Sequence, residues 1–90
     1  MNLDKTNPVV LVGLGELARD LLPSISLVLG KTPDFLYDNN KDFWGKKLFD
    51  LQCLNYSQLV ALPKNTKIVL ATRLADQIFE QFIEIGFENT

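Results

Sequence analysis

The chain has 90 residues, a net charge of −2 at pH 7, a single cysteine (Cys53) and no histidine. Its composition, 47% hydrophobic and 22% charged, predicts one folded domain over residues 8–90, preceded by a flexible N-terminus over residues 1–7. The scattered lysines and arginines argue against a nucleic-acid surface, and one thiol without histidine excludes a disulfide framework and an ordinary zinc site. Because the sequence shows no signal peptide and no apolar stretch of about 20 residues, we expect a cytoplasmic protein that does not contact membranes.

The first predicted elements are a buried strand and a helix joined by a glycine turn. Residues 9–12 are four consecutive apolar residues, three of them β-branched, which is typical of a strand buried on both faces of a parallel sheet. The helix, expected over residues 15–29, carries apolar residues at spacings of three and four on one face. Pro23 predicts a kink or two collinear pieces in this helix, and Gly30 is typical of the residue that ends one.

The rest of the chain alternates short strands with helices. Residues 35–37 form a short apolar run closed by polar residues, which predicts a second strand. Residues 48–54 indicate a hairpin-like extended segment whose most strand-like part is 51–54. The remaining predicted elements are a helix at 56–62, a strand at 67–71 and a helix at 73–85.

This alternation predicts an α/β fold, a small three-layer sandwich with a mostly parallel sheet. If the strands follow doubly wound order, the first strand is central and lies between residues 35–37 and 67–71. Ligands of such sheets bind at the carboxyl ends of the strands, where the order reverses. The glycine turn, Thr72 and Arg73 are all expected at that place.

The segment from Gly13 to Ala18 fits the pattern G-x-G-x-x-G/A, directly after a strand and at the start of a helix. Asp38 follows Gly15 by 23 residues, at the end of the second strand. In a dinucleotide site the glycines admit the pyrophosphate and the acidic residue holds a ribose hydroxyl, which makes Gly13, Leu14, Gly15 and Asp38 candidate binding residues. The alternative is a sharp turn without a ligand, favoured by Glu16, whose charge would repel a phosphate at the helix N-terminus.

Three segments, residues 8–22, 35–55 and 62–89, resemble a recurring bacterial Rossmann-like module. The shared layout is G-x-G-x-x-G/A, then Asp-Asn with a glycine six positions after the asparagine, a hairpin, an apolar strand and a final helix ending in Gly-Phe. Such modules precede the catalytic parts of sugar acyltransferases that modify UDP-amino sugars, of FkbM-type methyltransferases and of other polysaccharide-building enzymes. In the acyltransferases this module holds the nucleotide of the sugar nucleotide. The resemblance implies that Asn39 joins Gly13, Gly15 and Asp38 in the site.

The same resemblance places the chemistry outside these ninety residues. The acyltransferases carry a glycine-histidine turn and a catalytic β-helix, and the methyltransferases use a later domain. No catalytic residue and no metal ligand is therefore predicted here.

Other residues have competing interpretations. Arg73, at the start of the last helix, either meets a phosphate or carboxylate or pairs with a surface acid such as Asp76. Tyr37 and Lys41 match the Tyr-x-x-x-Lys spacing of short-chain dehydrogenases, but that pair needs a helix. Phe43 and Trp44 either pack in the core or form an apolar lip. Cys53 is expected to be a buried small hydrophobe.

Three functions follow from these patterns. The first is a nucleotide- or nucleotide-sugar-binding domain of a larger bacterial sugar-modifying enzyme, with a UDP-sugar or NAD as ligand and no catalysis of its own. The second is the NAD-binding half of an oxidoreductase. The third is an interaction module that has lost its ligand. Because a further parallel strand normally follows the final helix, we expect a longer parent chain or a homo-oligomer to cover the open sheet edge.

Overall fold

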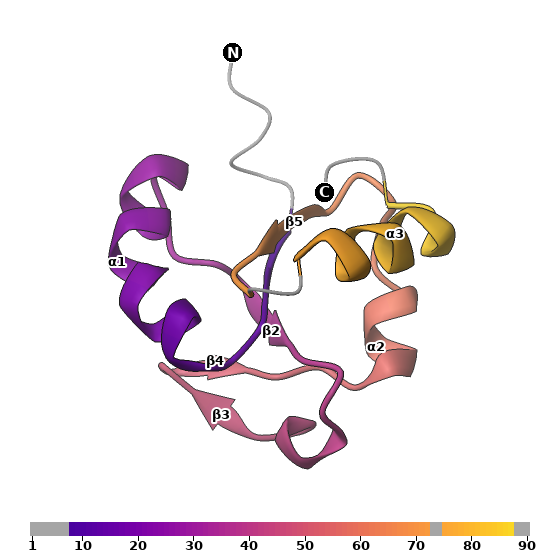
Figure 1. Cartoon of the computed structure of the whole chain (residues 1–90), viewed down its shortest axis with the longest axis horizontal. Helices are drawn as coiled ribbons and strands as arrows, with labels where there is room; N and C mark the ends of the chain where they lie inside the picture. The colour runs from indigo at the N-terminus through magenta and orange to yellow at the C-terminus, as the bar shows by residue number, and fades with distance from the viewer. Residues whose placement is uncertain (1–7, 73–74, 88–90) are drawn as a thin grey trace.

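The central strand of the molecule, β1 (Val9–Val12), is buried along its whole length and has a parallel neighbour on each side (Figure 1). In the computed structural model, residues 8–72 and 75–87 are described. Strand β2 (Phe35–Tyr37) pairs with one edge of β1, and β5 (Lys67–Leu70) pairs with the other. The order β2-β1-β5 confirms the predicted central place of the first strand and the parallel direction of its neighbours.

One side of this sheet is covered by α1 (Glu16–Leu29), as Figure 1 shows. Side chains alternate between the two sides of a strand, and Leu11 of β1 faces α1. The cluster around Leu11 excludes water almost completely. Its other buried members are Leu14, Ala18, Leu36, Cys53 and Ala71.

The opposite side is covered by α2 (Tyr56–Val60) and α3 (Ala75–Ile85) (Figure 1). Val10 and Val12 of β1 face these helices and belong to a second cluster. Its other buried members are Tyr37, Leu54, Leu59, Ile68, Phe82 and Phe87. The described residues thus form a small mixed α/β fold with three α-helices and a three-stranded parallel sheet.

Helix α1 continues through Pro23 as one helix, which excludes two collinear pieces, one of the two expected alternatives. Pro23 is exposed, which keeps its ring away from the packed face, and the proline removes only one backbone donor from the helix. Gly30 ends the helix as expected, with φ 76° and its N–H donating to the carbonyl of Ser26 at 3.0 Å.

The strand predicted at 51–54 is the main correction. Only Leu51–Gln52 forms a strand, β4, and it pairs antiparallel with β3 (Lys47–Leu48) in a separate two-stranded hairpin. The turn between them is Phe49-Asp50, where both residues have positive φ (55° and 61°). Cys53 then makes an isolated parallel bridge to Leu36 of β2. The predicted hairpin is present, but residues 51–54 do not form a fourth strand of the parallel sheet.

The boundaries of the last elements also differ from the prediction. Helix α2 begins with the expected capping box, because the Asn55 side chain accepts from the Gln58 N–H and the Gln58 side chain accepts from the Asn55 N–H. It ends at Val60 and not at 62, which is consistent with the restriction that Pro63 places on the residue before it. Strand β5 ends at Leu70, one residue early. The predicted start of the last helix at 73 lies outside the described residues.

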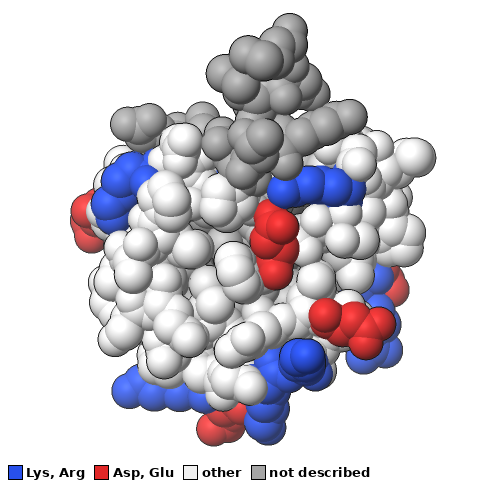
Figure 2. Space-filling model, turned by 180° about the vertical axis from the view of Figure 1, so that it is seen from behind, with Lys and Arg blue, Asp and Glu red and all other residues white. Residues whose placement is uncertain are grey.

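The surface carries charges of both signs. Figure 2, which views the molecule from behind, shows acidic and basic side chains interspersed around a largely uncharged area. Among the helices within residues 8–72 and 75–87, none combines the length and apolar character that crossing a bilayer requires.

Candidate functional site

The glycine turn lies at the carboxyl end of β1, between the carboxyl ends of β2 and β5. The N–H of Gly13 donates to the carbonyl of Tyr37 in β2 at 2.9 Å. On the other side, a Cβ at Gly13 would meet the carbonyl oxygen of Ala71 at 2.7 Å and the Cβ of Thr72 at 3.1 Å. Because Gly13 also has φ 101°, its lack of a side chain is required by the fold itself.

Asp38 binds the glycine turn directly. Its Oδ2 accepts a hydrogen bond from the N–H of Leu14 at 3.0 Å, and its Oδ1 accepts one from the N–H of Asn40 at 2.8 Å. The carboxylate therefore joins the turn after β1 to the loop after β2. The side chain of Leu14 is only 8% exposed and belongs to the core cluster on the α1 side.

Gly15 is the open part of the turn. It occupies the N-cap position of α1 in an extended conformation (φ −81°, ψ −168°), and no side chain caps the helix. A Cβ at Gly15 would meet nothing within 4 Å. The first backbone N–H groups of a helix lack intrahelical acceptors and carry partial positive charge. This N-terminus can therefore accept an anion close to the backbone.

Some of the predicted site residues lie together at the glycine turn, and others lie elsewhere or outside the described residues. The structure brings Gly13, Leu14, Asp38 and Thr72 together around the turn, with Thr72 half-buried against Gly13. Arg73 lies outside the described residues, and so does the side chain of Glu16 on which the ligand-free interpretation depends.

Asn39, implied by the resemblance, is engaged elsewhere. Its side-chain amide exchanges two hydrogen bonds with Gln81 of α3, at 3.0 and 3.1 Å. The pair links the loop after β2 to a helix 42 residues later. No local sequence signal marks Gln81, because its partner is distant in the chain.

Trp44 is a further residue whose role the sequence left open. Its indole N–H donates to the carbonyl of Asp38 at 2.7 Å, and its ring lies 6.2 Å from that of Tyr37. Trp44 packs against both core clusters and Phe43 against one of them. Core packing, and not a free apolar lip, is therefore the observed state of both rings. Trp44 also holds the backbone of the loop that presents Asp38.

Cys53 and the pair Tyr37 and Lys41 lack the features of catalytic side chains. Burial is the main cause that raises the pKa of the Cys53 thiol and of the Tyr37 hydroxyl. A thiol that stays protonated is a poor nucleophile. Tyr37 is in a strand and Lys41 begins the 3₁₀ turn η2 (Lys41–Phe43), so they do not share a helix face. No cluster of three metal-ligating side chains occurs within residues 8–72 and 75–87.

Comparison of the chain with protein-family models, curated proteins and solved structures finds no match. The resemblance to bacterial sugar-nucleotide modules therefore stays a prediction carried by its short motifs. What the geometry provides is a helix N-terminus without a side-chain cap, beside a carboxylate that is fixed in position.

Proposed function

We propose that this domain is a three-layer, Rossmann-like module that binds a nucleotide or nucleotide-sugar in the cytoplasm, as the non-catalytic part of a larger bacterial sugar- or polysaccharide-modifying enzyme. The observation that carries the proposal is the open space at Gly15. It lies at the N-terminus of α1, at the carboxyl end of the central strand of a parallel sheet. This is the place where open α/β sheets bind phosphates.

The phosphate and the ribose of a nucleotide would each have a partner in this arrangement. A phosphate would rest on the first N–H groups of α1, with Gly15 allowing close approach. The two oxygens of Asp38 each accept one backbone hydrogen bond, and each keeps capacity for a ribose hydroxyl. Thr72 closes the β5 side, where Arg73 follows in sequence. Asn39 contributes only if it leaves Gln81.

The ligand class is tested by titration. The ¹⁵N-labelled protein is titrated with NAD, NADP, a UDP-sugar and S-adenosylmethionine while the amide shifts of Gly13, Gly15 and Asp38 are followed. Shifts with the UDP-sugar alone support the proposal. Shifts with NAD alone favour an oxidoreductase half, which would share this geometry because the phosphate and ribose contacts are common to both ligands.

A pair of variants at Gly15 separates binding from folding. Both Gly15→Asp and Gly15→Ser provide a helix cap, which we expect to raise the free energy of unfolding by about 0.3 kcal/mol. Gly15→Asp also places a negative charge at the phosphate position and should weaken nucleotide affinity about tenfold or more. Gly15→Ser caps the same N–H groups without adding a charge and should weaken nucleotide affinity less than Gly15→Asp does. Equal nucleotide affinity of the two variants would contradict the proposed phosphate position.

A second function, an interaction module without ligand, is favoured by one contact. Asp38 already accepts from the Leu14 N–H, an N–H that a bound phosphate could otherwise use. If the amide signals of Gly13, Gly15 and Asp38 do not shift with any of these ligands, the result would support this alternative and exclude the nucleotide site.

A further inference from the structure

The outer edge of β5 is open in the described part of the chain, where β5 pairs only with β1. Lys67 and Ala71 donate their N–H groups to the carbonyls of Pro8 and Val12, at 2.9 and 2.8 Å. Because backbone groups alternate in direction along a strand, those of Ile68 and Leu70 point away from β1. Two donors and two acceptors therefore face outward, in the arrangement that an added strand would need.

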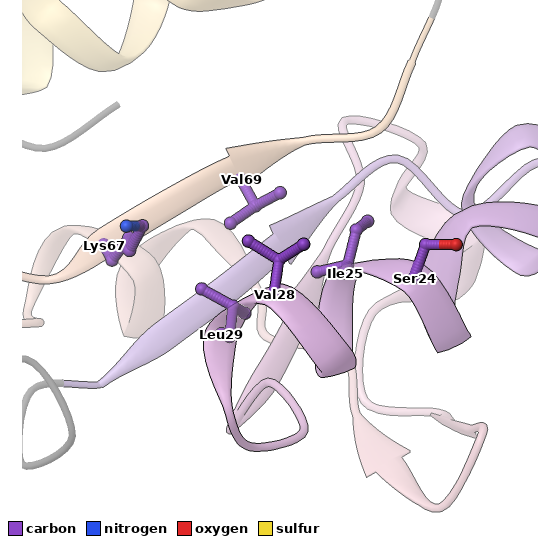
Figure 3. A pocket seen from close by; sticks show the side chains of 6 residues that line it. All are labelled: Ser24, Ile25, Val28, Leu29, Lys67 and Val69. Atoms are coloured by element: carbon purple, nitrogen blue, oxygen red, sulfur yellow. The ribbon is translucent and has the colours of Figure 1, made fainter.

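An apolar groove runs beside this edge, on the α1 side of the sheet (Figure 3). It has a volume of about 320 Å³. Figure 3 shows Val28 of α1 and Val69 of β5 pointing toward each other across it. The residues that line the groove are Ser24, Ile25, Val28, Leu29, Lys67 and Val69.

The groove leaves aliphatic surface exposed to water. Val28 is 87% exposed although it stands beside the sheet, and Val69 is only half-buried. A strand added to β5 would project every second side chain onto this side of the sheet. One such side chain, opposite Val69, would enter the groove and cover both valines.

The positive charge of Lys67 indicates which kind of strand would bind at this edge. Lys67 is the one charged residue lining the groove and is exposed, and no ion pair involves it within residues 8–72 and 75–87. A second copy pairing antiparallel about Val69 would place Ala71 across from Lys67 and bring no carboxylate. A strand from another domain or protein, with an acidic residue opposite Lys67, would pair with the outward backbone groups of β5 and form an ion pair with Lys67.

We propose that the outer edge of β5 and the α1 groove together bind an extended peptide segment, with an acidic side chain opposite Lys67 and an aliphatic side chain opposite Val69. The two partner residues are two positions apart, since both face the same side of the sheet. None of the residues that line the groove belongs to the glycine turn, and the proposal does not depend on nucleotide binding. The occupant is a strand from another domain or protein.

The probe is a capped peptide with the sequence Thr-Val-Thr-Glu-Thr-Val-Thr, which has the same spacing in both strand directions. We expect binding with a dissociation constant on the order of 0.1–1 mM. The amide signals of Ile68 and Leu70 should shift, and their hydrogen exchange should slow. Replacing the glutamate of the peptide with lysine should weaken binding about tenfold.

Two exposed neighbours on α1 provide matched variants. Val28→Glu places a carboxylate in the groove and should weaken peptide binding about tenfold or more. Leu27→Glu makes a similar change at a residue that is 83% exposed and does not line the groove, so it should leave affinity within about twofold. Both positions are so exposed that neither change should unfold the protein.

The charge contact is tested by exchange. Lys67→Glu should weaken binding of the glutamate peptide and strengthen binding of the lysine peptide. Equal effects of Val28→Glu and Leu27→Glu, or shifts that avoid Ile68 and Leu70, would overturn the proposal. So would concentration-dependent dimerisation through this edge without peptide, because the occupant would then be a second copy.

Discussion

Two glycines in one motif have different physical roles at the residue scale. Gly13 is confined, because a Cβ there would lie 2.7 Å from the backbone oxygen of Ala71, whereas Gly15 faces open space. The motif alone does not distinguish these cases. The closeness of β5, which begins 54 positions after Gly13, decides them. Gly13 is therefore explained by packing, and only Gly15 is left for a ligand.

This difference predicts opposite responses to alanine. Gly13→Ala must move β5 or strain the turn at φ 101°, and should lower the free energy of unfolding by about 3 kcal/mol. Gly15→Ala loses some capping preference but also restricts the unfolded chain, so the net change should stay within about 0.5 kcal/mol. Urea denaturation followed by circular dichroism measures both. Similar midpoints for the two variants would show that the contact with Ala71 does not constrain the turn.

At the element scale, how much the sequence predicts depends on whether a signal is local. β1 is an uninterrupted apolar run and the α2 capping box has its partners three residues apart, so both were predictable. The hairpin turn Phe49-Asp50 was not, because positive φ at both positions normally selects Asn-Gly. The contact between Asn39 and Gln81 joins residues that are 42 positions apart, and no local sequence pattern around either residue predicts it.

The same hairpin supplies a stability prediction. Phe49 and Asp50 hold left-handed conformations that disfavour residues with a Cβ. The double change Phe49→Asn with Asp50→Gly should raise the free energy of unfolding by about 1 kcal/mol, measured by urea denaturation. Phe49 is 38% exposed, so its replacement removes only part of a buried side chain. Asp50→Ala alone keeps a Cβ in the strained position and should give no gain. A gain from that control would show that loss of the charge, and not relief of the backbone, is responsible.

At the scale of the whole molecule, the two sides of the sheet each bury one weakly acidic group. Tyr37 belongs to the cluster under α2 and α3, and Cys53 belongs to the cluster under α1. Burial raises the pKa of Tyr37 above its ordinary 10.0 and that of Cys53 above its ordinary 9.0. Both groups therefore hold their protons more tightly in the folded state than in the unfolded chain.

The sign of the resulting pH dependence follows from this difference. Stability from these groups is complete below pH 9 and is lost as the pH rises, since the unfolded chain releases its protons first. Unfolding free energies measured from pH 7 to 11 should therefore fall above pH 9, and Tyr37→Phe or Cys53→Ala should each flatten part of that decline. Phe79→Leu is the control, because Phe79 is 43% exposed and has no titratable group, so its replacement should leave the shape of the profile unchanged. If the unfolding free energy fell equally steeply with pH in Tyr37→Phe and in the unchanged protein, burial of the Tyr37 hydroxyl would not be the cause of the pH dependence.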